Sequence, residues 1–197
     1  SIANYNIKGF VISNLSSFML INKLPTNGNF EYIANYTLNS YNSYTEKELT
    51  NLGINKITIS PELSSNDIDN LCSKSDFSRE LIVYGRTPLM SSNYCLLGHS
   101  NKCYPNCGTR CLDNKQYYLK DRLGFKFRII PDNVQTVTTI FNSKITLIDG
   151  SVFNVNSYRI DILDEDIEQI NSIVSTVLAG NRLEGKEYTN GNLNREI

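Results

Sequence analysis

The sequence lacks the features that mark several large classes of protein. None of its 197 residues lie in an apolar run long enough to span a bilayer, so we expect no membrane-spanning helix and no membrane partner. Its 19 Lys and Arg residues nearly balance its 20 Asp and Glu residues, and the net charge is -1. The whole chain therefore has no general attraction to nucleic acid, although a local basic patch could still bind RNA.

Histidine is also scarce, and three common functional motifs are missing. The single histidine, His99, lies among clustered cysteines, so we do not expect a Ser-His-Asp triad in this chain. The sequence contains no HExxH zinc motif, no phosphate-binding GxxxxGK[ST] loop and no dinucleotide-binding GxGxxG run. We expect His99 to be exposed, and metal ligation is its alternative role.

The first residues, Ser1-IANYNIKG, contain no charged start followed by an apolar stretch, which a secretory signal peptide would require. We therefore expect a cytoplasmic protein, in which thiols stay reduced and clustered cysteines more often bind metal than form disulfides.

Four of the five cysteines form one cluster, with the spacing C-x7-C-x3-C-x3-C: Cys95, Cys103, Cys107 and Cys111. The segment between them is rich in Gly, Pro and Asn and cannot bury a core of its own. Four thiolates could order it by binding one zinc ion or one 4Fe-4S cluster, and the spacing does not decide between the two. Two disulfides, or unrelated free thiols, are the alternatives. Cys72 stands apart at helical spacing from Ile68, and we expect it to be a buried core thiol.

The first half of the chain alternates between short β-branched runs and helical patterns. Strands are expected near residues 10–13, 30–36, 56–60 and 80–85, and helices near 16–24, 44–53 and 65–74. Ser43 or Thr45 is the expected cap of the second helix, and Gly53 its stop. This alternation predicts an α/β fold with parallel strands, related to part of a TIM-type (β/α) barrel.

The second half of the chain has a different pattern, with more extended segments and a single long helix. A hairpin is expected over residues 117–132 with its turn near Leu123-Gly124, followed by extended segments at 137–149 and 157–163. Asp164 is the expected cap of a last helix with a core-facing apolar stripe, which ends at Gly180, and the polar tail after it is expected to be a surface arm. We divide the chain into a β/α half-barrel (1–90), a Cys-rich loop with a β-rich appendage (91–163) and a terminal helix with its tail (164–197).

Functional residues of parallel α/β folds collect at the carboxyl ends of the strands. Here those positions include Asn14, residues 35–39, Glu62 and Arg86. Glu62 and Arg86 are our candidate catalytic residues, because a carboxylate and a guanidinium on neighbouring strand ends could bind a polar substrate or carry out acid–base chemistry. A structural salt bridge is the alternative interpretation.

Several segments resemble one known family. They are Asn35-YTLNSYNS, Ile57-TISPEL, Glu80-LIVYGRTPLM, Tyr94-Cys95, Tyr117-YLKDRLGFKF, Tyr158-RIDIL and Tyr188-TNGNLNRE. Together they resemble the peptidase U32 family, also called collagenase-like proteases. The order of the segments is similar to the carboxyl-terminal half of such a protein, which implies that the missing amino-terminal half would be a partner of this one.

The resemblance implies a peptidase acting on a peptide or protein. Other members of the family hydroxylate transfer or ribosomal RNA, or act in ubiquinone synthesis, and some hold a 4Fe-4S cluster through family cysteines; Cys95, Cys103, Cys107 and Cys111 are the matching residues here. Many members carry a further cysteine after the loop, but Gln135-TVTTIFNS has none. The alternatives to a peptidase are therefore an RNA-modification factor, or a metal-stabilised module that binds substrate without catalysing a reaction.

Overall fold

A computed structural model describes residues 7–23, 30–74, 76–95, 97–98, 111, 115–132, 134, 136–181 and 183–195. It divides into two compact units, and each is described by itself. Unit 1 comprises Ser1–Tyr84, Leu147–Glu184 and Asn190–Ile197, and unit 2 comprises Gly85–Thr146 and Gly185–Thr189. Cys103 and Cys107, as well as His99, lie outside the described residues.

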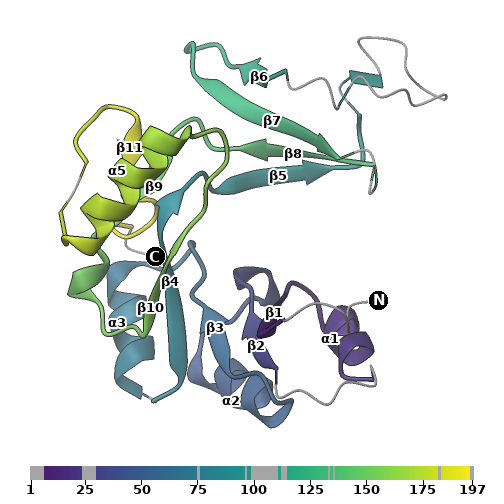
Figure 1. Cartoon of the computed structure of the whole chain (residues 1–197), viewed down its shortest axis with the longest axis vertical. Coiled ribbons are helices and arrows are strands. Elements are labelled where there is room, and N and C mark those ends of the chain that lie inside the picture. Colours follow the sequence, from purple (N-terminus) through teal and green to yellow (C-terminus); the bar gives the residue numbers. More distant parts are fainter. Residues whose placement is uncertain are drawn as a thin grey trace. The chain divides into compact units, whose positions relative to one another are not determined.

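Unit 1 is built on a parallel sheet (Figure 1). Its strands are β1 (Gly9–Ile12), β2 (Glu31–Ala34), β3 (Lys56–Thr58), β4 (Ser78–Gly85) and β10 (Ser157–Ile160). Strands β1 to β4 pair in chain order, and β10 pairs with β4, all in parallel. The α/β prediction is thus confirmed for a sheet of parallel strands with helices, whereas the described residues contain no closed barrel and the partial TIM-type barrel stays a prediction.

Four α-helices belong to unit 1: α1 (Leu15–Ile21), α2 (Ser43–Asn51), α3 (Ser65–Lys74) and α5 (Ile167–Leu178). Two short 3-10 helices, η2 (Tyr36–Leu38) and η4 (Gly150–Val152), lie between them. The cap prediction for α2 was wrong, because Asn42 rather than Ser43 or Thr45 caps it by accepting the Thr45 backbone N–H. Gly53 ends this helix as predicted, with a φ of 94° that favours glycine.

The core of unit 1 lies on one face of the sheet. Side chains of successive strand residues alternate between faces, and Ile12, Ala34 and Ile57 on this face are at most 1% exposed. They pack with Phe18 of α1 and Leu49 of α2. A second cluster joins Leu81 and Val83 of β4 to α3 and includes Cys72, which confirms the predicted buried thiol.

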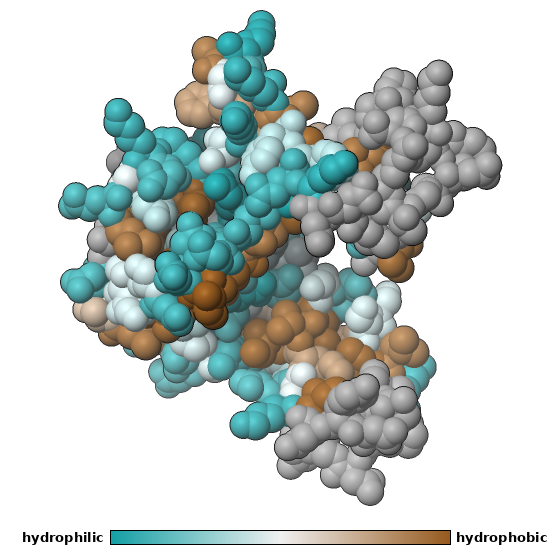
Figure 2. Space-filling view, turned by 45° about the horizontal axis from the view of Figure 1, so that its top comes forward, coloured by the Kyte–Doolittle hydropathy of each residue, from teal (hydrophilic) through white to brown (hydrophobic). Residues whose placement is uncertain are grey.

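The other face of the sheet is exposed at β1 but buried at β3 and β4, where Thr58 and Tyr84 are at most 2% exposed. Val11, which points to that face by the strand alternation, is 56% exposed, whereas its neighbour Ile12 is fully buried. Hydrophobic residues (brown) also reach the surface in the lower part of the view in Figure 2. The polar residues that follow the strands therefore lie near a surface that a ligand can reach.

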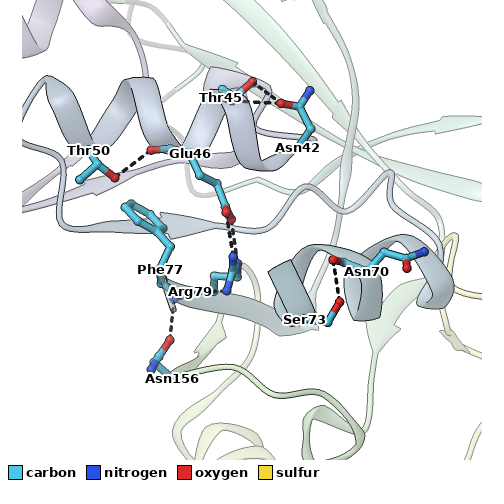
Figure 3. Close-up of polar contacts among 9 residues, drawn as sticks. All are labelled: Asn42, Thr45, Glu46, Thr50, Asn70, Ser73, Phe77, Arg79 and Asn156. Atoms are coloured by element: carbon cyan, nitrogen blue, oxygen red, sulfur yellow. Dashed lines mark hydrogen bonds and ion pairs between the residues drawn. The ribbon is translucent and has the colours of Figure 1, made fainter. Parts of the chain in front are cut away.

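One buried ion pair ties α2 to β4. Glu46 and Arg79 are 2% exposed each, and both oxygens of the carboxylate accept hydrogen bonds from the guanidinium (Figure 3). The Arg79 backbone N–H donates to Asn156 Oδ1, which links the same point to the segment before β10. The arrangement fixes the start of β4.

For the last helix, the predicted cap was wrong and the predicted core-facing stripe holds only in part. The cap of α5 is Asp166 and not Asp164, and it forms a reciprocal capping box with Gln169. The apolar stripe of α5 is only partly core, since Ile173 is 4% exposed but Leu178 is 80% exposed. The described part of the tail is bound to α3, because the Leu193 carbonyl accepts hydrogen bonds from the backbone N–H and the hydroxyl of Ser65.

Unit 2 contains an antiparallel sheet in the order β5-β8-β7-β6, formed by β5 (Pro88–Ser92), β6 (Tyr117–Lys120), β7 (Lys126–Asp132) and β8 (Val137–Phe141). The predicted hairpin is confirmed as β6 and β7, and Gly124 in its turn has a φ of 90°. Asp121 shapes that turn by accepting the backbone N–H groups of Leu123 and Phe125. Strand β5 was not predicted, and Pro88 at its start is consistent with an edge strand.

The described residues also contain a short parallel pair, β9 (Ile145–Leu147) with β11 (Tyr188–Thr189). None of the helices within the described ranges has the length and apolar character that crossing a bilayer requires.

Candidate functional site

Polar side chains collect where the parallel strands of unit 1 end. Ser13 follows β1, Asn35 follows β2, and Asp161 follows β10. The backbone N–H of Asn35 still bonds to the Ile12 carbonyl, and that of Asp161 to the Tyr84 carbonyl, so both residues continue the strand pairing. The carboxyl edge of this sheet is the place where parallel α/β folds carry their ligand sites.

A chain of side-chain hydrogen bonds joins three of these strand ends. Asn35 Nδ2 donates to Ser13 Oγ at 3.2 Å, and Asn35 Oδ1 accepts from Arg159 Nη1 at 3.1 Å. Arg159 Nε donates in turn to Asp161 Oδ1 at 2.6 Å. The Arg159 and Asp161 side chains are 26% and 37% exposed. The guanidinium is thus held in a fixed orientation while solvent still reaches the pair.

Tyr36 lies in the electrostatic field of this pair. Burial and the negative charge of Asp161 raise the pKa of the Tyr36 phenol above its ordinary value, and the positive charge of Arg159 opposes part of that rise. The hydroxyl consequently stays protonated and available as a hydrogen-bond donor at neutral pH.

Glu62, a predicted catalytic residue, lies after β3 at the same edge of the sheet. Its Oε2 accepts a hydrogen bond from the Tyr41 hydroxyl at 2.9 Å, and its backbone N–H donates to Ser60 Oγ. A hydrogen bond with Ser60 acts to lower the pKa of Tyr41, but burial and the Glu62 carboxylate raise it, and the net direction is upward. The Glu62 side chain is exposed and could reach a ligand.

Tyr84 and Glu165 form a second pair at the end of β4. The Tyr84 hydroxyl donates to Glu165 Oε1 at 2.8 Å, and the backbone N–H groups of Leu163 and Asp164 donate to Oε2. Burial acts to raise the pKa of the Glu165 carboxyl, but these hydrogen bonds outweigh it and lower the pKa. Glu165 is therefore an ionised group that organises the segment before α5.

Arg86, the other predicted catalytic residue, belongs to unit 2. Its Nη1 donates to the backbone carbonyls of Asn142 at 3.0 Å and of Ser143 at 2.7 Å. These hydrogen bonds stabilise the segment between β8 and β9, so Arg86 has a structural role there. Glu62 lies in the other unit, so the pairing of Glu62 with Arg86 stays a prediction.

Two of the four clustered cysteines are described. Cys95 and Cys111 are partly buried and carry free thiols, and the Gly98 backbone N–H donates to Cys95 Sγ at 3.2 Å. A sulfur that accepts a backbone N–H fits the donor chemistry of a metal-bound thiolate. Among the described residues no group of three or more possible metal ligands comes together, but Cys103 and Cys107 lie outside them.

Sequence reasoning missed Arg159 and Asp161 as site residues, whereas Tyr36 lies within the predicted strand-end positions 35–39. The rule that polar groups gather at strand ends would have found Asp161, if the segment at 157–163 had been assigned to the parallel sheet. Arg159 carried no such signal, because it lies within β10 and reaches Asn35 from 124 positions away in the sequence.

Comparison with known proteins gives one finding. A family model described as peptidase family U32 matches residues 1–177, which is most of the chain. Neither the search of curated proteins nor the search of solved structures found a match.

Proposed function

This chain belongs to peptidase family U32, and from that premise we propose that it is a peptidase domain that binds a peptide at the carboxyl edge of the parallel sheet in unit 1. The family match supports a peptidase or collagenase-like activity. The observation that carries the choice of site is the chain of hydrogen bonds from Ser13 through Asn35 and Arg159 to Asp161. It brings together partly exposed polar groups from distant parts of the sequence on one edge.

In this proposal Glu62 is the acid–base group. Hydrolysis of a peptide bond needs a group that takes a proton from water and returns one to the leaving amine, and an exposed carboxylate can do both. The hydrogen bond from Tyr41 would hold the Glu62 carboxylate in place. Arg86 stays a proposed catalytic residue, although both of its hydrogen bonds within the described part of the chain go to backbone carbonyls.

We also propose that Cys95, Cys103, Cys107 and Cys111 hold one zinc ion or one 4Fe-4S cluster. The sulfur donors and the N–H bond to Cys95 fit either group. Bound zinc would stabilise the Cys-rich loop, whereas an iron–sulfur cluster would supply electron transfer. The cytoplasm is the proposed compartment, because reduced, clustered thiols serve as metal ligands there.

The test is a variant series in the complete natural protein that contains this chain. Glu62→Gln removes the titrating group and keeps its shape, so the rate of cleavage of a gelatin-derived peptide mixture should fall about 100-fold or more. Glu48→Gln, an exposed change on α2, is the matched control and should leave the rate unchanged. Equal rates in the wild type and Glu62→Gln would remove Glu62 from the catalytic machinery.

A further inference from the structure

The Arg159–Asp161 pair has hydrogen-bonding capacity that its own contacts do not use. Arg159 donates from Nε to Asp161 and from Nη1 to Asn35. Within the described part of the chain, its Nη2 has no hydrogen-bond partner. Asp161 uses Oδ1, and its Oδ2 is likewise without a partner among the described residues. Both side chains are partly exposed, so one free donor and one free acceptor face solvent from the same edge of the sheet.

We propose that Arg159 and Asp161 form a subsite for one extended residue of a peptide, with Arg159 donating to the carbonyl oxygen of that residue and Asp161 accepting its N–H, because these two groups of an extended residue point to the same side of the chain. The inference rests on the proposed peptidase function and adds to it how the substrate backbone is held. Glu62 remains the acid–base group, and the pair has a binding role.

The charge of the pair selects against simple anions. The guanidinium is already neutralised by a carboxylate at 2.6 Å, so a phosphate or carboxylate ligand would be repelled by Asp161 as well as attracted by Arg159. A neutral ligand that both accepts and donates satisfies both residues, and the backbone of one extended peptide residue does so with its C=O and its N–H. Because Asp161 needs an N–H, the subsite would reject a proline at the amide nitrogen that it binds.

The groups around the pair support a fixed geometry. Asn35 holds Arg159 on one side and is itself held by Ser13, so the guanidinium loses little freedom when a ligand binds. The Tyr36 hydroxyl has no hydrogen-bond partner among the described residues, and it lies close enough to be influenced by both charges of the pair. It would supply a second donor for the carbonyl oxygen of the same peptide residue.

The experiment measures binding and not turnover. The probe is an uncharged peptide of alternating alanine and glycine, acetylated and amidated at its ends, which is titrated into the 197-residue chain. The affinity and the NMR signal of the Arg159 Nε–H group are followed together. A parallel series uses analogues in which single amides are replaced by esters, which lack the N–H that Asp161 would accept.

Binding that shifts the Arg159 Nε–H signal supports the subsite, provided that Arg159→Gln and Asp161→Asn each weaken it roughly ten- to hundred-fold. One ester position should weaken wild-type binding by a similar factor and should lose its effect in Asp161→Asn. The matched controls Arg195→Gln and Asp69→Asn change exposed residues and should bind as the wild type does. Tyr36→Phe is a milder second variant and is expected to weaken binding several-fold. It allows the subsite to be tested even if Arg159→Gln does not fold.

Three results would overturn the subsite. They are an absence of peptide binding, binding that both variants leave unchanged, and binding of a single-stranded oligouridine probe, lost in Arg159→Gln, in place of the peptide. The two proposals can fail separately. Peptide binding that depends on Arg159 but is not followed by hydrolysis would support the subsite and contradict the peptidase activity. Hydrolysis with a KM that Arg159→Gln leaves unchanged would support the peptidase activity and contradict the subsite.

Discussion

Arg79 Nε and Nη2 each donate a hydrogen bond of 2.7 Å to a different oxygen of Glu46, and both residues are almost completely buried (Figure 3). Arg79 Nη1 donates also to the Phe77 carbonyl. A parallel two-bond contact of this kind satisfies both carboxylate oxygens without water. It joins α2 to the first residues of β4, the central strand on which the candidate site depends.

Removing the charge from Glu46 should therefore destabilise the protein strongly. Glu46→Gln removes the negative charge that both oxygens present to the buried Arg79 guanidinium, and the free energy of unfolding should fall by about 3–5 kcal/mol. Urea denaturation followed by circular dichroism measures it. Glu48→Gln on the exposed side of the same helix should change the value by less than about 0.5 kcal/mol. Equal losses in the two variants would contradict a structural role for the pair.

Glu165 should make stability depend on pH in the acid range. Its pKa is lower in the folded protein than the ordinary value of 4.5, so the unfolded chain binds more protons there. The stabilisation is fully present above about pH 4.5 and is lost as the pH falls through the folded pKa. Glu165→Gln should cost about 1 kcal/mol at neutral pH, since the site is partly exposed, and less at pH near 3.

The measurement is the free energy of unfolding of the wild type and Glu165→Gln across that pH range, with the exposed Glu184→Gln as the control. A difference between wild type and Glu165→Gln that grows as the pH falls would show that the sign of the shift is wrong.

Asp166 should matter for α5 while Asp164 should not matter as a cap. Asp166→Ala removes the oxygen that accepts the Gln169 backbone N–H, and the free energy of unfolding should fall by about 1 kcal/mol. Asp164→Ala leaves the capping box intact and should cost less. Thermal denaturation of both variants compares them directly, and a larger loss in Asp164→Ala would favour the cap predicted from the sequence.

Metal content should depend on the clustered cysteines and not on Cys72. Cys95→Ser and Cys111→Ser should each lower the metal bound per chain severalfold in protein purified without oxygen, because each removes one of four sulfur ligands. Cys72→Ala changes a core thiol and should leave the metal content as it is. About four irons and four sulfides per chain would identify the cluster, and one zinc without visible absorption would identify zinc. Metal-free wild-type protein would contradict the ligand assignment.

The sequence predicted the local elements of unit 1 well, because each strand from β1 to β4 is a short β-branched run separated by a helix with a recognisable start. It was less informative wherever two distant segments meet. Nothing in residues 157–160 shows that they pair with β4, and nothing in the polar tail shows that Leu193 accepts hydrogen bonds from Ser65. The caps of α2 and α5 were misplaced because several Asx and Ser residues precede each helix and all of them can cap.

The same limit explains which part of the site was predicted. Glu62 was found because it directly follows a recognisable strand, and its hydrogen bond to Tyr41 is consistent with a held carboxylate. Arg159 was missed because its role depends on reaching Asn35 across the edge of the sheet, a contact that only the folded chain creates.

The central claim is that this chain is part of a peptidase, and isotope incorporation during peptide cleavage tests it most directly. The complete natural protein is incubated with gelatin-derived peptides in ¹⁸O-labelled water, and the new carboxyl termini are examined by mass spectrometry. The account predicts new termini that carry one ¹⁸O atom from water and that form much more slowly with Glu62→Gln. Metal-replete, folded protein that produces no labelled termini would contradict it.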